Sequence, residues 1–188
     1  MIYMLEIRSA EESILETKED MFIAGYALVF DSPTLIGEQN GIKYYEIIEK
    51  EALTNCDLTD IVLRYNHDDK TQLLARTSNN TLTVKVDDVG LYIEATIANT
   101  TIGRDIYELI KRGDISKMSF GFIVDKDSYK GNIRHIEAIK TIKDVSVVDF
   151  PAYSETNVQA IYRNFDKAKE EAEANLLKEA LKTVLLSY

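Results

Sequence analysis

The side chains of this sequence that best suit nucleophilic catalysis are a serine and a histidine. A serine hydroxyl is a poor nucleophile at neutral pH unless a base accepts its proton, and histidine is the usual base. The sequence contains two histidines, His67 and His135. His67 follows the strand-like segment 60–66 and precedes two aspartates, a setting that by itself is more typical of a surface turn. His135 lies inside IRHIEAI, where it equally fits a structural role in a strand.

Ser119 stands out among the serines because of its local setting. It follows a predicted helix and a Gly/Asp turn, opens a strand-like segment, and precedes Gly121 by two residues. A glycine there lets the backbone approach a substrate closely, and backbone N–H groups nearby can stabilise an oxyanion. Because Ser-x-Gly is a common string, these residues alone indicate a candidate nucleophile and do not establish one.

Other catalytic chemistries are disfavoured by the sequence. Cys56 is the only cysteine, so neither an internal disulfide nor a metal site built from several thiolates can form. Acidic residues flank Cys56 and disfavour the thiolate, which favours a structural role. The consecutive His67, Asp68 and Asp69 form a poor metal site, because neighbouring residues rarely converge on one ion and no second cluster completes the shell.

The composition disfavours several classes of partner. The 188-residue chain carries 22 Lys and Arg against 32 Asp and Glu, a formal net charge of -10. No basic run can follow a phosphate backbone, so we expect no nucleic-acid partner and no anionic membrane surface. No apolar stretch approaches the roughly 18 residues of a spanning helix, and the first residues lack the basic and apolar regions of a secretory signal. We therefore expect a cytosolic chain without a membrane anchor.

Seven segments are predicted to be β-strands. Apolar and polar residues alternate most clearly in 81–87 and 90–97, and the link VDDVG between them suits a hairpin. Two predicted helices, 44–55 and 103–113, interrupt the strands. Short strands at this spacing predict a mainly β (α+β) fold, a barrel or sandwich with flanking helices. The remaining predicted strands are 21–30, 60–66, 118–125, 133–139 and 144–150.

The last residues, 166–188, contain neither Gly nor Pro and are predicted to form an amphipathic C-terminal helix appended to a domain of residues 1–165. The apolar stripe of this helix can pack on its own domain, on a second copy of the chain, or on a partner helix, and the sequence does not choose between them. The stripe comprises Ala174, Leu177, Leu181, Val184 and Tyr188.

Four strings carry a family resemblance through their order and spacing. They are YNHDD (65–69), LLAR (73–76), DDVGLYIEATIANTTIGRDIYELIKRGDISKMSFGF (87–122) and KDVSVVDFPAYSETNV (143–158). Together they resemble the prohead proteases of tailed bacteriophages, which are distantly similar to the herpesvirus assembly proteases, or assemblins. One departure is Ala75, where relatives commonly have Gly, so Arg76 either helps to organise the oxyanion region or pairs with a surface acid.

The resemblance implies roles for the candidate residues. Ser119, in the Met-Ser-Phe-Gly-Phe string, corresponds to the nucleophile, and His67, in the Asn-His-Asp string, corresponds to its general base. The third catalytic member is expected at Asp144, at the head of the strand that many relatives write Glu-Val-Ser. Asp149 on the same segment is an alternative, and His135 is another, because assemblins use a Ser-His-His arrangement. This chemistry requires no metal and no organic cofactor.

The resemblance also implies a fold and a function. The expected fold is an assemblin-like seven-stranded antiparallel β-barrel plus a C-terminal helix. The expected enzyme is a serine endopeptidase, of phage or prophage origin, that cleaves scaffold sequence from the major capsid protein, and cleaves itself, during prohead maturation. It is expected to act in the bacterial host cytoplasm, inside the immature capsid. The alternatives are a non-catalytic capsid assembly factor with the same fold and a β-barrel module that binds an unknown ligand.

Overall fold

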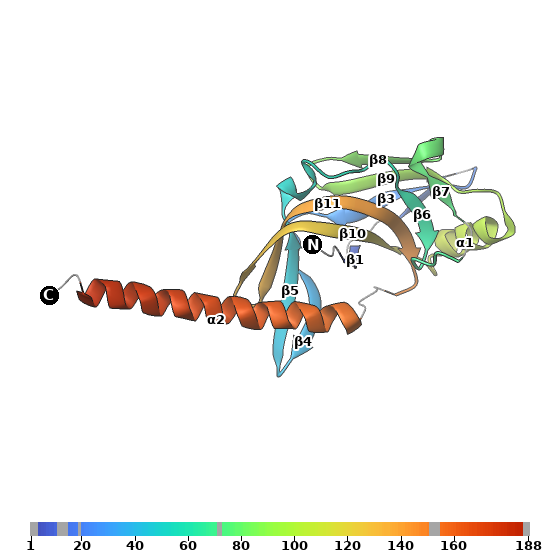
Figure 1. The fold of residues 1–188 in the computed structure, drawn as a ribbon. Helices are drawn as coiled ribbons and strands as arrows, with labels where there is room; N and C mark the ends of the chain where they lie inside the picture. The colour runs from blue at the N-terminus through green and yellow to red at the C-terminus, as the bar shows by residue number, and fades with distance from the viewer. Residues whose placement is uncertain (1–3, 11–14, 19, 71–72, 151–154, 186–188) are drawn as a thin grey trace.

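The computed structural model describes residues 4–10, 15–18, 20–70, 73–150 and 155–185. This part of the chain forms two β-sheets, with a long C-terminal helix projecting from them (Figure 1). The strands are β1 (Leu5–Ala10), β2 (Glu16–Lys18), β3 (Phe22–Val29), β4 (Thr34–Gln39), β5 (Ile42–Ile48), β6 (Val62–Tyr65), β7 (Ala75–Arg76), β8 (Leu82–Val86), β9 (Gly90–Thr96), β10 (Lys117–Lys130) and β11 (Ile133–Val148). The helices are α1 (Thr101–Arg112), α2 (Glu155–Leu185) and the short 3₁₀ helices η1 (Lys50–Leu53) and η2 (Thr77–Asn79).

A long hairpin of β10 and β11 forms the centre of the first sheet. Its antiparallel register runs from Lys117 opposite Val148 to Lys130 opposite Ile133, with irregularities that locally shift the pairing. β1 pairs with the other edge of β10, while β5 and β6 pair in parallel with two separate stretches of β11. The main path is β1-β10-β11-β5-β4, and β6 joins β11 to β7. Segments far apart in the sequence therefore meet along one hairpin.

The second sheet has the order β2-β3-β9-β8 and is antiparallel throughout. Apolar side chains from both sheets enter one continuous core, in which burial of apolar surface stabilises the two layers against each other. Ile23 and Leu91 of the second sheet and Phe122 and Val145 of the first are completely or almost completely buried in it. Ser119 and Asp144 therefore lie on strands whose other residues are fixed in a packed core, and His67 directly follows such a strand.

α1 delivers the chain to the start of β10. The Thr100 hydroxyl accepts a hydrogen bond from the N–H of Gly103 and caps the first turn, and Ile106 and Ile110 bury one face of the helix. Gly113, with a φ of 84°, ends the helix in the left-handed conformation that glycine tolerates best. The predicted helix 103–113 and its glycine stop are confirmed.

The mainly β fold with flanking helices is confirmed, whereas the closed seven-stranded antiparallel barrel is not. The strands of the described ranges divide between two sheets, and no ladder among them joins these sheets into one cylinder. β1 and β4 end the first sheet as edge strands instead of pairing with each other. This sheet is also mixed, because β11 pairs in parallel with both β5 and β6.

The predicted helix at 44–55 is wrong. β5 occupies the first half of this segment and pairs with β4 and β11, and η1 follows it. The run YYEII is aromatic and β-branched, so it fits a pleated strand once a neighbouring strand satisfies its backbone. The predicted strands 133–139 and 144–150 are also joined, because β11 runs continuously through both. β1, β2, β4 and β7 have no counterpart among the predicted strands.

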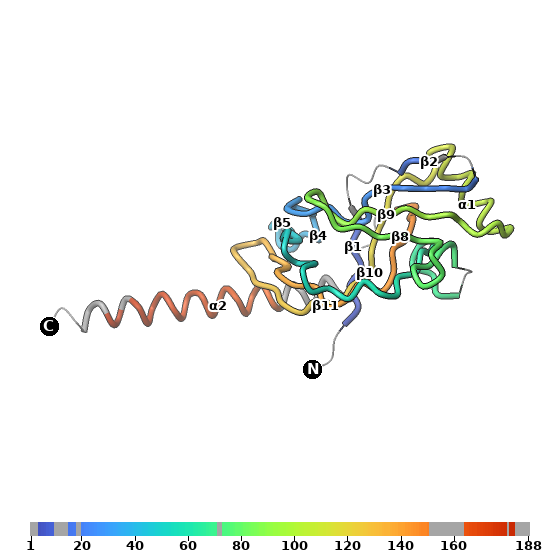
Figure 2. The backbone as a smooth tube through the Cα atoms, turned by 90° about the horizontal axis from the view of Figure 1, so that it is seen from above, coloured from blue at the N-terminus to red at the C-terminus, as the bar shows by residue number. Residues whose placement is uncertain are grey.

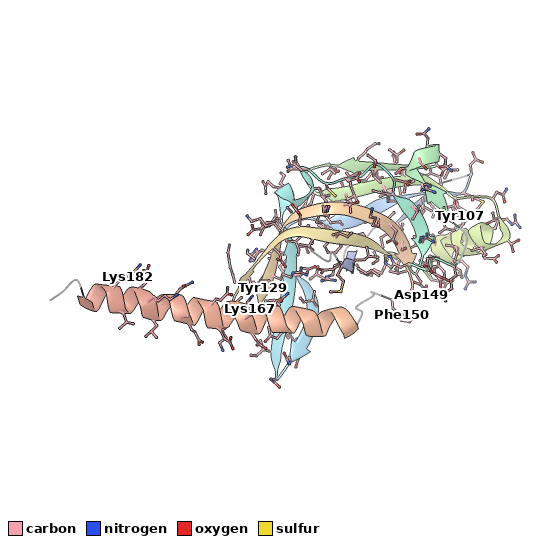
Figure 3. All side chains as sticks on the ribbon, viewed as in Figure 1. Tyr107, Tyr129, Asp149, Phe150, Lys167 and Lys182 are labelled. Atoms are coloured by element: carbon pink, nitrogen blue, oxygen red, sulfur yellow. The ribbon has the colours of Figure 1, made fainter. Side chains whose placement is uncertain are left out.

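The N-terminal third of α2, which we call its base, packs on the first sheet through the aromatic side chain of Phe165. Phe165 is 4% exposed, and its ring centroid lies 4.7 Å from those of both Tyr44 and Tyr129. Figure 3 shows Tyr129 beside the helix, close to Lys167. Phe165 thus anchors α2 to the sheet, and the helix itself begins at Glu155, well before the predicted residue 166.

Beyond its base, α2 runs away from the two sheets, as two perpendicular views agree (Figures 1 and 2). Within the predicted stripe, Ala174 is exposed, and the exposed fractions of Leu177 and Leu181 are 64% and 54%. The Val184 side chain and Tyr188 lie outside the described residues. The described part of the stripe thus does not pack on its own domain. Neither α-helix, over its described residues, has the length and apolarity needed to cross a membrane.

Candidate active site

Three side chains from three adjacent segments of the first sheet form a chain of hydrogen bonds. The Nε2 atom of His67 lies 2.7 Å from the Oγ of Ser119, and its Nδ1 atom lies 2.5 Å from Oδ2 of Asp144. Ser119 lies on β10, Asp144 on β11, and His67 directly after β6 (Figure 1). The structure therefore brings together the three residues that the sequence predicts as nucleophile, base and orienting acid.

The register of the β10–β11 hairpin sets the relative positions of the serine and the acid. Ser119 pairs with Ser146, and Gly121 pairs with Asp144. Because residues two apart in a strand share a face, Ser119 and Gly121 face the same side of the sheet as Ser146 and Asp144. A shift of the hairpin by one residue would move one member to the opposite face.

A tight turn after β6 returns the imidazole over this face. Asn66 and His67 have φ values of 51° and 56°, in the left-handed region that asparagine tolerates better than most residues. The N–H of Asn66 donates to the carbonyl oxygen of Val147 at 3.0 Å, and its side-chain amide donates to Asp149 Oδ2 at 3.0 Å. The string NHDD thus forms a turn and also places His67 beside Ser119. Its interpretation as a turn and its interpretation as the source of a catalytic histidine are therefore compatible.

Ser146 links the acid to the histidine and was not singled out from the sequence. Its hydroxyl donates to Asp144 Oδ2 at 3.1 Å and accepts the backbone N–H of His67 at 3.1 Å. Ser146 is completely buried, so both bonds are shielded from water. The signal that could have identified it is its position two residues after Asp144, on the same face of a strand.

Gly121 has a structural reason that differs from the predicted one. A Cβ atom at this position would lie 2.2 Å from Oδ1 of Asp144 and 3.3 Å from its Cγ. The missing side chain therefore leaves room for the carboxylate beside Ser119. A role of backbone N–H groups near Gly121 in stabilising an oxyanion stays a prediction.

The two alternative third members have other partners. Figure 3 shows Asp149 just beyond the end of β11, where it accepts from the Asn66 side chain and thereby stabilises the turn rather than the imidazole. His135 pairs with Ser128 in the β10–β11 ladder, far along the hairpin from Ser119, and its Nδ1 lies 2.5 Å from Glu49 Oε1. One nitrogen of the His67 imidazole thus contacts Ser119 and the other contacts Asp144. Asp149 and His135, the two alternatives, have the other partners given above.

Two further candidates from the sequence lie outside this chain of hydrogen bonds. The Arg76 guanidinium forms two hydrogen bonds with the Asp60 carboxylate, at 2.7 and 2.6 Å, on an exposed part of the surface. Arg76 therefore pairs with a surface acid. Burial raises the pKa of the Cys56 thiol to about 11, so this thiol is protonated at neutral pH and is a poor nucleophile.

The arrangement is suited to proton transfer. Asp144 is 7% exposed and Ser119 is 0% exposed, so the hydrogen bonds act in a region from which water is excluded. With a proton on Nδ1 shared with the Asp144 carboxylate, Nε2 is free to accept the Ser119 proton. The Ser119 hydroxyl has a further partner, the carbonyl oxygen of Arg8 in β1, at 2.7 Å.

Replacing Gly121 by Ala tests the fit between the glycine and the carboxylate. We expect this substitution to lower the free energy of unfolding by about 1–3 kcal/mol, because the added methyl group displaces Asp144. In an Asp144→Ala background the same substitution should cost less than about 0.5 kcal/mol, because the overlapping atoms are gone. Urea denaturation of the four proteins measures both costs, and equal costs in the two backgrounds would contradict this role of Gly121.

Comparison with known proteins identifies the family of this chain. The chain matches the family described as caudovirus prohead serine protease over residues 5–171, which contain Ser119, His67 and Asp144. No curated protein and no solved structure matches the chain. Because the match spans most of the 188 residues, the resemblance seen in the four strings is confirmed. The chain belongs to the caudovirus prohead serine protease family, the capsid maturation proteases of tailed phages.

Proposed function

We propose that this chain is a serine endopeptidase that cleaves scaffold sequence from phage capsid proteins, and cleaves itself, during prohead maturation. The observation that carries the proposal is the continuous chain of hydrogen bonds from Ser119 through His67 to Asp144, in a member of a prohead serine protease family. A serine joined to a buried histidine and carboxylate is the arrangement that acyl transfer to serine requires.

The proposed reaction has two halves. The Ser119 Oγ attacks the carbonyl carbon of the scissile peptide while His67 Nε2 accepts its proton, and the protonated imidazole then gives that proton to the leaving amine. Asp144 holds the imidazole by Nδ1 and stabilises its positive charge, and Ser146 holds Asp144 in turn. In the second half, His67 accepts a proton from water as the water attacks the acyl-enzyme ester, and the imidazolium returns that proton to the Ser119 Oγ as the bond to the acyl carbon breaks.

The family match supports a proposal for the site of action and the partners. We place the activity in the bacterial host cytoplasm, inside the immature capsid, with the major capsid protein and its scaffold sequence as substrates. Residues 1–165 would form the protease domain, and residues 166–188 the appended part of the C-terminal helix. The net charge of -10 supports the absence of nucleic-acid and anionic membrane partners from this scheme.

Coexpression with the cognate major capsid protein tests the proposal. We expect the wild-type chain to shorten the capsid protein and itself, and the Ser119→Ala variant to leave both intact, because no nucleophile remains. Intact-mass spectrometry measures both products. Cleavage by Ser119→Ala would contradict the nucleophile, and uncut capsid protein in assembled particles with the wild-type chain would favour the non-catalytic assembly factor.

A matched pair of variants separates the acid from its neighbour in the same assay. Asp144→Asn should slow cleavage by about 10⁴-fold, because the imidazole loses the acceptor that orients it. Asp149→Asn should cleave at nearly the wild-type rate, because the new side-chain oxygen can still accept from Asn66. The reverse pattern would make Asp149 the third member.

We also propose that α2 mediates self-association. Leu177 and Leu181 are mostly exposed on a helix that extends away from its own domain, and exposed apolar surface of this kind is stabilised by a partner. Phe165 keeps the base of the helix attached, so a second chain can reach the stripe without unfolding the domain.

Sedimentation measures this association. The full chain should form oligomers, whereas a chain lacking residues 166–188 and the Leu177→Glu/Leu181→Glu variant should both be monomers. Leu176→Ala is the control, because Leu176 is 71% exposed but lies outside the predicted stripe. Identical monomers in every case would exclude self-association and leave α2 as a docking element for capsid or scaffold.

A further inference from the structure

The candidate nucleophile is completely covered in this structure. Ser119 is 0% exposed, although attack requires its Oγ to meet the carbonyl carbon of an incoming peptide. One edge of β10 is occupied by β11, which carries Asp144, and the other edge by β1. The β1 ladder extends from Leu5 opposite Ile123 to Ala10 opposite Met118, and it places Ser9 directly opposite Ser119. A peptide that approaches the edge of β10 opposite β11 therefore meets β1.

The backbone of β1 contacts the nucleophile directly. The Ser119 hydroxyl donates to the carbonyl oxygen of Arg8 at 2.7 Å. A hydroxyl has one proton, so this bond competes with donation to Nε2 of His67, which attack requires. In a productive complex the carbonyl carbon faces Oγ and the oxygen faces separate donors. The peptide group of Arg8 therefore lies where a substrate peptide would lie. Its carbonyl oxygen faces Oγ in place of its carbon, so this arrangement is unproductive.

β1 is anchored from its opposite face by buried ion pairs. Glu6 and Arg8 alternate with Ser9, so they lie on the side of the sheet away from the active site. The Arg8 guanidinium forms hydrogen bonds with Glu46 at 2.6 and 2.9 Å, and the Arg134 guanidinium forms hydrogen bonds with Glu6 at 2.6 and 3.0 Å. All four side chains are buried.

The arginines of this cluster lower the pKa of the Glu6 carboxyl. Burial alone would raise the pKa of the Glu6 carboxyl, but the hydrogen bond and charge of Arg134, aided by Arg8, lower it below its ordinary value. Glu6 is therefore charged at neutral pH and can hold β1. Such pairs fix geometry strongly, because removing one partner leaves a buried unpaired charge. β1 is thus held in place by side chains that take no part in the proposed chemistry.

We propose that β1 occupies the position of a substrate strand on β10 and keeps Ser119 latent until an extended segment of the substrate replaces it, antiparallel to the same edge. This inference rests on the proposed function, because it takes Ser119 as the nucleophile. Once β1 leaves, the outer edge of β10 around Ser119 offers backbone donors and acceptors to a peptide of extended conformation. The substrate's scissile peptide group then takes the place of the Arg8 peptide group beside Ser119, but it is turned so that its carbonyl carbon faces Oγ.

A reversible cross-link tests the inference without a capsid substrate. Leu5 and Ile123 are paired directly across β1 and β10, so the Leu5→Cys/Ile123→Cys variant can hold β1 in place by a disulfide. We expect a fluorophosphonate probe to label Ser119 in the reduced variant at the wild-type rate and to leave the oxidised variant unlabelled, as read by peptide mass spectrometry. Thr83→Cys/Glu94→Cys, a pair across β8 and β9, is the control, and its oxidation should not change labelling.

A second variant weakens the buried ion pairs that hold β1, whereas the disulfide fixes β1 in place. Arg8→Ala/Glu46→Ala removes both members of one buried pair, so no unpaired charge is left by it, and β1 should detach more often. We expect labelling of Ser119 to accelerate on the order of tenfold, because the probe reacts only with the open fraction. Hydrogen exchange of the β1 amides should rise in parallel.

The outcomes separate the inference from the proposed function. Equal labelling of Ser119 in the oxidised, reduced and anchor variants would overturn the role of β1 and leave Ser119 as the nucleophile. Folded reduced and anchor variants that the probe never labels at Ser119 would overturn the proposed function, and the inference with it. Ser119→Ala in each background shows which label belongs to this residue.

Discussion

The active site depends on the register between β10 and β11. This one ladder places Ser119 opposite Ser146 and Gly121 opposite Asp144, and the same strand β11 pairs with β6, whose end carries His67. Ser146 contacts both the Asp144 carboxylate and the His67 backbone, so it transmits the register to the imidazole. The apolar residues that alternate with these positions, such as Phe120 and Val145, are buried in the core, and a slip of one residue would turn them away from it. Packing of the core and alignment of the site are therefore fixed together.

The same sheet holds both the candidate catalytic residues and the strand that covers Ser119. β10 has two edges, and its inner edge assembles the site while its outer edge is covered by β1. The buried pairs of Arg8 with Glu46 and of Glu6 with Arg134 hold β1 from the face opposite Ser119. A substrate strand must then compete with an intramolecular strand that binds at high effective concentration. Such competition would suit the proposed role in prohead maturation, in which cleavage follows assembly.

Much of the site could be predicted from sequence, and less of the fold. The strings around His67, Ser119 and Asp144 carry the family resemblance through their order and spacing, and hairpin 81–97 shows the alternation of half-exposed strands. The contact of Ser146 with His67 was not predicted, because it exists only when strand pairing brings the two residues together. The segment 44–55 was predicted as a helix because short apolar runs fit either period, and pairing with β11 decided the outcome. β1 was missed for a related reason, since its charged residues are buried only through partners distant in sequence.

The hydrogen-bonded state of His67 provides the most direct test of this account. Imidazole ¹⁵N and ¹H NMR spectra identify which ring nitrogen carries a proton, and with only two histidines a His135→Gln variant makes the assignment. We expect a proton on Nδ1 of His67 with a far-downfield resonance, because that proton lies in the bond to the Asp144 carboxylate. The resonance should be retained in Ser119→Ala and should move upfield or disappear in Asp144→Asn. An Nδ1 without a proton, or a resonance that does not respond to Asp144→Asn, would contradict the account.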